Sequence, residues 1–379
     1  MFETFLFNFT HNLFKPLLLF FYMGFAMSLF KVPLEFPKPM YQFLTIYLLI
    51  SIGWHGGEEL ASLSMTDLEH AGGFMIIGFV TNTIIGLLAY VLLRKATRLR
   101  QIDAATVAGY YGSDSAGTFV TCLGVLTAAN LAFASYMPVL LAVMEVPGCL
   151  VALFLVSRMR ASGKMDVHGN MPGDSPYVPS GAPFPALSLG AAAAANRAEP
   201  AGVFNTKVLH EVFLNPGLFL LFGGILIGFI SQQQGVRVTD SMDKFFVVLF
   251  KGMLGLFLLE MGMTACSRLK DLHTAGWRFI LFGLLAPNLF ATFGILVAHG
   301  YSMFLGEPFA IGTYVLFGVL CGAASYIAVP DVQRLAIPEA SPTLPLAASL
   351  GLTFSYNVTI GIPLYILIAT ALTAAIPVG

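Results

Sequence analysis

Long apolar runs separated by short polar segments dominate this chain. A membrane-spanning helix needs about 20 consecutive, mostly apolar residues. Ten runs approach or exceed this length, at 13–30, 38–55, 72–93, 103–127, 133–157, 213–231, 244–266, 276–299, 308–330 and 343–375. The pattern therefore predicts an all-α integral membrane protein with ten transmembrane helices.

One long polar segment interrupts the apolar pattern. Residues 158–207 are rich in Pro, Gly and Ala, and they include Met171-Pro172-Gly173 and Ser180-Gly181. Such a composition is typical of a flexible linker. The linker divides the chain into two five-helix halves, 1–157 and 208–379.

The two halves carry matching sequence features in the same order. The matches are Pro16 and Gly24 with Pro216 and Gly224, Asp67-Leu68-x-x-Ala71-Gly72 with Asp271-Leu272-x-x-Ala275-Gly276, and Glu145-Val146 with Asn357-Val358. Five spans per half is an odd number, so the second half must enter the membrane from the opposite side. We therefore expect a 5+5 inverted repeat.

Composition and charge agree with a membrane protein and indicate its orientation. The chain is 57% hydrophobic and only 10% charged, whereas soluble domains carry about 25% charged residues. A net charge of −1 leaves no basic face for nucleic acid. With both termini outside, only Lys15, Arg237, Lys244 and Lys251 fall on or near the outer side. Because Lys and Arg favour the cytoplasmic side, the linker is predicted to be cytoplasmic. The first apolar run lacks a basic leader and a cleavage site, so we read it as a retained helix.

Two glycine- and hydroxyl-rich stretches interrupt predicted spans at corresponding places in the halves. They are Gly112-Ser113-Asp114-Ser115-Ala116-Gly117-Thr118 and Gly322-Ala323-Ala324-Ser325-Tyr326. Broken helices at matching positions are the best sequence indication of a secondary transporter's binding site. Their positive ends would converge near the midplane and suit a small anion. The alternative is that small residues merely allow close helix packing.

Side chains in these stretches supply candidate ligands. Ser113, Ser115, Thr118 and Ser325 offer hydroxyls, and Asp114, Glu145 and Glu260 are acids within spans. An intramembrane acid is by default a functional hypothesis, here as a ligand of a coupling cation. Asp114 would repel an anion unless a cation or proton neutralised it. Glu145 and Glu260 are equally compatible with structural hydrogen bonds, and Tyr326 with either a wall of the site or a packing role.

Other classes of function find less support. The sequence has no H-E-x-x-H zinc motif, no G-x-S-x-G elbow and no P-loop, so we predict no enzyme. A cation/proton antiporter, a proton-coupled carrier of a small carboxylate and a membrane receptor or sensor stay open. A receptor, however, would not require two symmetric breaks.

Several segments resemble the signatures of the SbtA-type sodium-dependent bicarbonate transporters. They are Ala108-Gly109-Tyr110-Tyr111-Gly112-Ser113-Asp114-Ser115, Met144-Glu145-Val146-Pro147, Leu259-Glu260-Met261-Gly262, Ala324-Ser325-Tyr326-Ile327-Ala328-Val329-Pro330, Arg334-Leu335-Ala336-Ile337-Pro338-Glu339-Ala340-Ser341-Pro342 and Asn357-Val358-Thr359-Ile360-Gly361-Ile362-Pro363. The resemblance covers nearly the whole chain.

The resemblance implies a core domain and a gate domain, assembled as a homotrimer in the plasma (inner) membrane. It implies bicarbonate bound between two crossing, broken helices beside sodium as the coupling ion, no organic cofactor, and an elevator-like movement. Some members bind a PII-like regulator from the cytoplasm. The anion site falls on Gly112, Ser113, Ser115, Gly322 and Ser325, with Ala323 and Ala324 between them. Asp114, Thr118, Glu145 and Glu260 are the sodium candidates.

Two positions depart from the family pattern. Ala323 and Ala324 stand in a break that is serine-rich in members similar to the cyanobacterial type, so backbone N–H groups would do more of the anion binding. Asp114 stands where the family usually carries a small neutral residue. These departures keep proton coupling, or a different small carboxylate, as alternatives.

Overall fold

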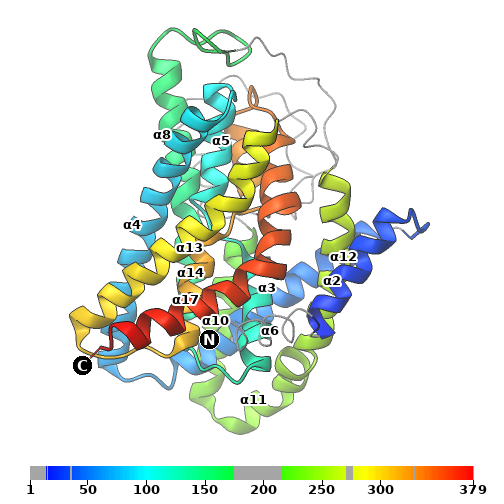
Figure 1. Cartoon of the computed structure of the whole chain (residues 1–379). Coiled ribbons are helices and arrows are strands. Elements are labelled where there is room, and N and C mark those ends of the chain that lie inside the picture. Colours follow the sequence, from blue (N-terminus) through cyan, green and yellow to red (C-terminus); the bar gives the residue numbers. More distant parts are fainter. Residues whose placement is uncertain are drawn as a thin grey trace.

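The protein is all-helical throughout the part described by a computed structural model (Figure 1). The structure describes residues 14, 16–34, 36–174, 216–269, 276–327 and 329–378. Most of the predicted linker, residues 271–275 of the second repeat motif and Lys15 lie outside these residues. In the described first half the helices are α2 (Pro16–Leu29), α3 (Lys38–Leu60), α4 (Met65–Ala96), α5 (Gln101–Tyr111), α6 (Ala116–Ala128), α7 (Met137–Met144) and α8 (Val146–Ala161).

The described second half is also helical. Its helices are α10 (Pro216–Gln234), α11 (Val236–Asp243), η1 (Lys244–Val248), α12 (Phe250–Leu269), α13 (Trp277–Leu305), α14 (Ile311–Gly322), α15 (Val329–Ala336), α16 (Leu344–Leu346), η3 (Ala347–Phe354), η4 (Asn357–Gly361) and α17 (Ile362–Ala375). The elements η1, η3 and η4 are π-helical turns that continue into their neighbours.

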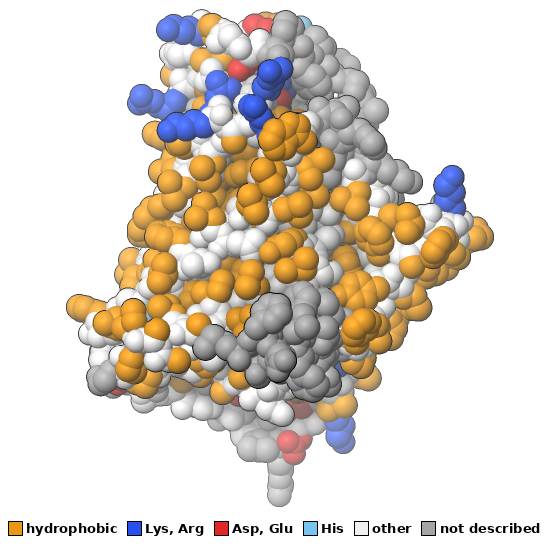
Figure 2. Space-filling model, viewed as in Figure 1, with side chains coloured by type: hydrophobic (Ala, Val, Ile, Leu, Met, Phe, Trp, Pro, Cys, Tyr) orange, Lys and Arg blue, Asp and Glu red, His pale blue; other side chains and the backbone are white. Residues whose placement is uncertain are grey.

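Apolar surface wraps the middle of the molecule, as a bilayer requires. Six continuous helical segments in the described residues are long and apolar enough to cross a membrane, namely 69–96, 137–161, 216–234, 238–267, 277–305 and 344–375. Figure 2 shows hydrophobic side chains over this middle zone and Lys and Arg gathered at one end. That end includes the last turns of α4, with Arg94 and Lys95, and of α8, with Arg158 and Arg160.

Four helices form a layer by pairing across the two halves. Helix α2 packs along α12, and α3 packs along α10. Glycines make both approaches possible: a Cβ on Gly24 would overlap the carbonyl oxygen of Leu259, and one on Gly228 would overlap that of Trp54. Close backbone contact through small residues is the usual way that helices associate in a membrane.

The two sequence breaks lie among the helices outside this layer. There α5 packs against α4 and α8, while α14 packs against α13 and α17. Pro287 lies inside α13 and has no N–H to offer the carbonyl of Gly283. The hydroxyl of Thr353 donates to that carbonyl instead, at 3.0 Å. Every backbone group at membrane depth needs such a partner, so η3 is tied to α13 at this point.

Candidate functional site

The first break separates α5 from α6. The chain leaves the helix after Tyr111, and α6 begins at Ala116 with Ser115 as its N-cap; the hydroxyl oxygen of Ser115 accepts from the N–H of Thr118 at 3.4 Å. Gly112 allows this turn because a Cβ there would lie 2.8 Å from Cα of Gly86 and 3.0 Å from Cα of Gly148. Neighbouring helices therefore close directly on the break.

The second break follows α14 and is longer. Helix α14 ends at Gly322, and α15 begins at Val329. In a continuous helix the Gly322 carbonyl would accept from a backbone N–H four residues later. Here the side-chain amide of Asn357 donates to it at 2.9 Å, and Tyr365 donates to the other end of that amide at 2.7 Å. The break is thus held open by η4 and α17.

The two breaks touch each other. The backbone N–H of Ser325 donates to the carbonyl of Tyr110 at 2.8 Å. The distal ends of α6 and α14 also meet, since the Gly312 N–H donates to the carbonyl of Ala132 at 3.0 Å and the Ala134 N–H to the hydroxyl of Thr313 at 2.8 Å. The two interrupted helices therefore contact each other at the breaks and at the far ends of α6 and α14. We call the place where the two breaks meet the crossing.

Several polar side-chain atoms at the crossing have no hydrogen-bond partner in the structure. They are the hydroxyls of Ser113 and Thr118 and both carboxylate oxygens of Asp114, and all three residues are buried. A buried polar group without a partner is costly, and a buried charge far more so. These oxygens are therefore suited to a ligand. Carboxylate and hydroxyl oxygens are the kind of ligand that a hard cation such as sodium binds.

Glu145 joins Asp114 at this place. It lies at the junction of α7 and α8 and is buried. Its carboxylate lies beside the hydroxyl of Ser325 and interacts electrostatically with Asp114. The carbonyl of Met144, just before it, accepts from the side chain of Asn82 on α4 at 2.9 Å. The structure thus brings acids from the first half to the second break.

The remaining predicted residues have different surroundings. Glu260 lies on α12, in the four-helix layer, where Thr264 donates to its carboxylate at 2.7 Å. Gly322 is the last residue of α14, and the N–H of Ala323 bonds back to Val319 at 2.9 Å. The N–H of Ser325 donates to the Tyr110 carbonyl, and its hydroxyl lies beside the Glu145 carboxylate. Ala324, between Ala323 and Ser325 in the sequence, is buried.

Some residues that shape the site carry no motif of their own. Asn82 and Asn357 each replace a missing backbone donor, and the sequence signal for both is an amide inside an apolar span. Arg100 is another: it is buried at the start of α5 and donates to both carboxylate oxygens of Asp103, at 2.7 and 2.9 Å. It also bonds the carbonyls of His168 and Glu339. This pair therefore ties α5 to the segment after α8 and to the segment after α15.

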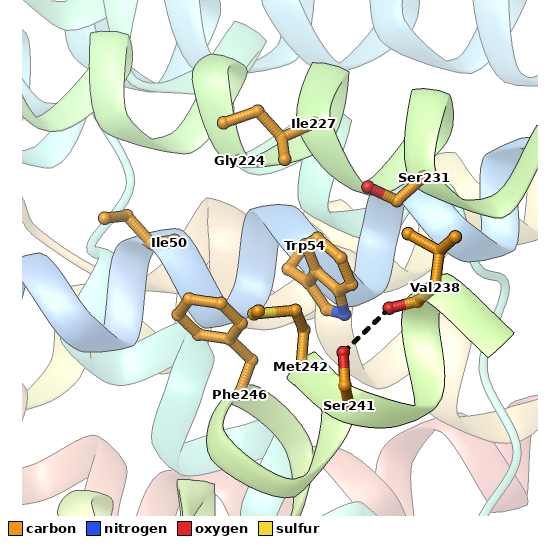
Figure 3. A pocket seen from close by; sticks show the side chains of 9 residues that line it. All are labelled: Ile50, Trp54, Gly224, Ile227, Ser231, Val238, Ser241, Met242 and Phe246. Atoms are coloured by element: carbon orange, nitrogen blue, oxygen red, sulfur yellow. Dashed lines mark hydrogen bonds between the residues drawn. The ribbon is translucent and has the colours of Figure 1, made fainter. Parts of the chain in front are cut away.

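A surface cavity of about 390 Å³ lies away from the crossing (Figure 3). It is lined by Ile50, Trp54, Gly224, Ile227, Ser231, Val238, Ser241, Met242 and Phe246. Its walls come from α3, α10, α11 and η1. The residues of the crossing, by contrast, are buried.

A family model described as the Na⁺-dependent bicarbonate transporter superfamily matches residues 16–370. The chain belongs to this superfamily. No curated protein matches the chain. Membership in the bicarbonate transporter superfamily confirms the resemblance of the sequence motifs, and it confirms that the chain is a transporter rather than an enzyme. It also gives sodium as the coupling ion and an anion as the substrate.

Proposed function

We propose that this member of the superfamily imports bicarbonate together with sodium at the crossing of the two broken helices. The observation that carries the proposal is the direct bond between the breaks, Ser325 N–H to Tyr110 carbonyl, beside buried oxygens that have no protein partner. Gly112, Ser113 and Ser115, with Gly322, Ala323, Ala324 and Ser325, form the anion side. Asp114, Thr118 and Glu145 form the cation side, and Glu260 is a further cation ligand on α12.

Charge neutralisation couples the two solutes in this proposal. The Asp114 and Glu145 carboxylates make the crossing unfavourable for an anion. A bound cation offsets their charge, and the anion then enters beside the first turn of α6. Each solute therefore raises the affinity for the other, as linkage requires.

The architecture supports an inverted repeat and a moving core. Glycines at the same internal positions of α2 and α10, Gly24 and Gly224, pack against the partner helices α12 and α3. This correspondence favours ten spans arranged as two opposed halves. We propose that the body carrying the crossing slides, elevator-like, against the layer of α2, α3, α10 and α12. The Lys and Arg at the ends of α4 and α8 favour a cytoplasmic linker and outside termini in the inner membrane.

The assembly follows from family resemblance. We propose a homotrimer surrounded by lipid, with a PII-like regulator as a cytoplasmic partner.

Uptake of labelled bicarbonate into proteoliposomes, with and without an inward sodium gradient, tests the proposal. The variant carrying Ser113→Ala and Ser115→Ala should raise the KM for bicarbonate, while Ser267→Ala, an exposed serine on α12 that bonds only its own helix, should not. Uptake that ignores sodium contradicts the proposed symport. Vesicle acidification or alkalinisation without bicarbonate would indicate an antiporter, and binding without transport would indicate a receptor.

Asp114→Asn tests the cation side separately. It removes the charge and keeps the shape, so the sodium dependence of uptake should fall while some anion binding stays. Asp240→Asn, at an exposed position on α11, is the matched control. Unchanged sodium dependence in Asp114→Asn would remove this carboxylate from the mechanism.

A further inference from the structure

The hydroxyl of Tyr326 stands out among the large buried tyrosines. Four of them are at most 2% exposed, so none of their hydroxyls reaches water: Tyr111, Tyr314, Tyr326 and Tyr365. Tyr111 bonds Thr353 at 2.6 Å, Tyr314 bonds Ser302 at 2.9 Å and Tyr365 bonds Asn357 at 2.7 Å. The Tyr326 hydroxyl has no hydrogen-bond partner among the residues that the structure describes. Buried tyrosine hydroxyls usually find one, which indicates that a ligand supplies it.

The Tyr326 hydroxyl is aimed at the first turn of α6. A Cβ on Gly117 would overlap the phenol oxygen, so only glycine leaves room for it there. The side chain of Ser115 lies next to the phenol, but no hydrogen bond of normal geometry reaches the hydroxyl. The first N–H groups of a helix lack intrahelical partners. The phenol therefore stands beside the end of α6 at which such N–H groups lie.

The ring is held in place by packing on its other side. Tyr326 meets Phe354 edge-to-face, with ring centroids 5.4 Å apart. Phe354 in turn meets Phe21 of α2 at 5.9 Å. A donor whose position is fixed before binding loses little freedom on binding. The phenol is thus preorganised at the boundary between the crossing and the four-helix layer.

The ligand class follows from the kinds of atoms that converge. The backbone N–H groups and the phenolic O–H are hydrogen-bond donors, and the N-terminus of α6 carries a partial positive charge. Together they suit an acceptor with negative charge. Of the proposed cation ligands, Asp114 interacts electrostatically with Glu145, and the Glu145 carboxylate lies beside the hydroxyl of Ser325.

We propose that the Tyr326 hydroxyl donates a hydrogen bond to the transported oxyanion at the first turn of α6, and so is a substrate-binding residue. This inference rests on the proposed function, because it places the substrate at the crossing. A small planar oxyanion would accept from the phenol on one oxygen and from the α6 N–H groups on another. Gly117 is then required as the position that lets the phenol approach.

The isosteric change Tyr326→Phe tests the proposal, because it removes only the hydroxyl. A hydrogen bond to a charged group is worth enough to raise the KM for bicarbonate by about tenfold or more. The maximal rate should stay within about twofold, since the ring still packs on Phe354. Tyr314→Phe is the matched control: it lies on α14, is equally buried, and its hydroxyl already has a protein partner. Its KM should equal that of the unaltered protein.

A KM within about twofold of the unaltered protein would overturn the proposal. A loss of maximal rate with an unchanged KM would also overturn it, because the phenol would then act in the movement and not in binding. Thermal stabilisation of the purified protein by sodium bicarbonate or sodium formate, against sodium chloride, separates this inference from the proposed function. If the protein transports no bicarbonate but formate stabilises it, and Tyr326→Phe removes the effect, the inference holds and the substrate assignment fails. If neither anion stabilises the unaltered protein and no uptake occurs, both fail.

Discussion

The backbone N–H of Ser325 donates to the carbonyl of Tyr110, and this 2.8 Å bond joins the two halves of the chain at the centre of the molecule. In a continuous helix the Tyr110 carbonyl would accept from the N–H of Asp114. The first break removes that donor, and the second break supplies another. Each interruption would leave an unpaired backbone group at membrane depth by itself. The two breaks are therefore stable as a pair.

Asn357→Leu should destabilise the second break. Leucine cannot donate to the Gly322 carbonyl or accept from Tyr365, so two buried groups lose their partners. Each unsatisfied group costs about 1–3 kcal/mol. We expect a lower midpoint of thermal unfolding in detergent and weaker bicarbonate uptake. Tyr365→Phe removes only the second bond and should cost less; an equal or larger cost would show that the amide is not what holds Gly322.

Gly228→Ala should disrupt the four-helix layer, because its Cβ would overlap the Trp54 carbonyl of α3. Backbone atoms cannot move aside as a flexible side chain can. Gly223→Ala, on the same helix, is the control, because a Cβ there meets nothing within 4 Å. Unfolding midpoints in detergent should fall for the first variant and stay the same or rise for the second, since alanine favours helix over glycine. Equal behaviour of the two variants would contradict the close approach of α3 and α10.

Arg100→Met should strongly destabilise the protein, since it leaves the Asp103 carboxylate buried without its counter-charge. Removing one partner of a buried ion pair costs about 3–5 kcal/mol. The double variant Arg100→Met with Asp103→Leu should recover part of that loss. Arg98→Met, at an exposed position two residues earlier in the chain, should have little effect. The comparison is made on thermal unfolding, and full additivity of the two changes would show that the pair does not interact.

Glu58 should make stability depend on pH. It lies beyond the predicted span 38–55, and partial burial together with Asp243 and Glu59 raises its pKa to about 7. His55 is also near, with Nδ1 3.9 Å from the Glu58 carboxylate. Because the folded protein holds this proton more tightly than the unfolded chain, the stabilising contribution is complete below about pH 4.5 and is lost as pH rises through 7. Glu58→Gln should make the unfolding midpoint depend less on pH across this range. An unchanged dependence on pH would contradict the raised pKa of Glu58.

The apolar pattern predicted much of the fold because membrane helices are specified locally. Each predicted span has a helix or an interrupted helix as its counterpart, and the break after Tyr111 follows the cluster of small residues that begins at Gly112. The membrane permits few other backbone arrangements. The family, the transporter class and the sodium dependence were likewise readable from motifs.

The arrangement of the second break could not be predicted from the sequence. The run Gly322–Ser325 predicts a break with the positive end of a second half-helix beside it, whereas the next helix, α15, begins only at Val329. The N–H of Ser325 instead donates to the carbonyl of Tyr110. That outcome depends on a residue more than 200 positions away, so no local pattern contains it.

The sequence by itself determined which segments are helical and where helices can break, because burial of apolar side chains and the freedom of glycine act over a few residues. The tertiary structure alone decided that the breaks bond to each other, that Asn357 holds Gly322, and that the Tyr326 hydroxyl is left without a protein partner. Hydrogen bonds between distant segments depend on the geometry of close packing, and that geometry exists only once the helices have assembled.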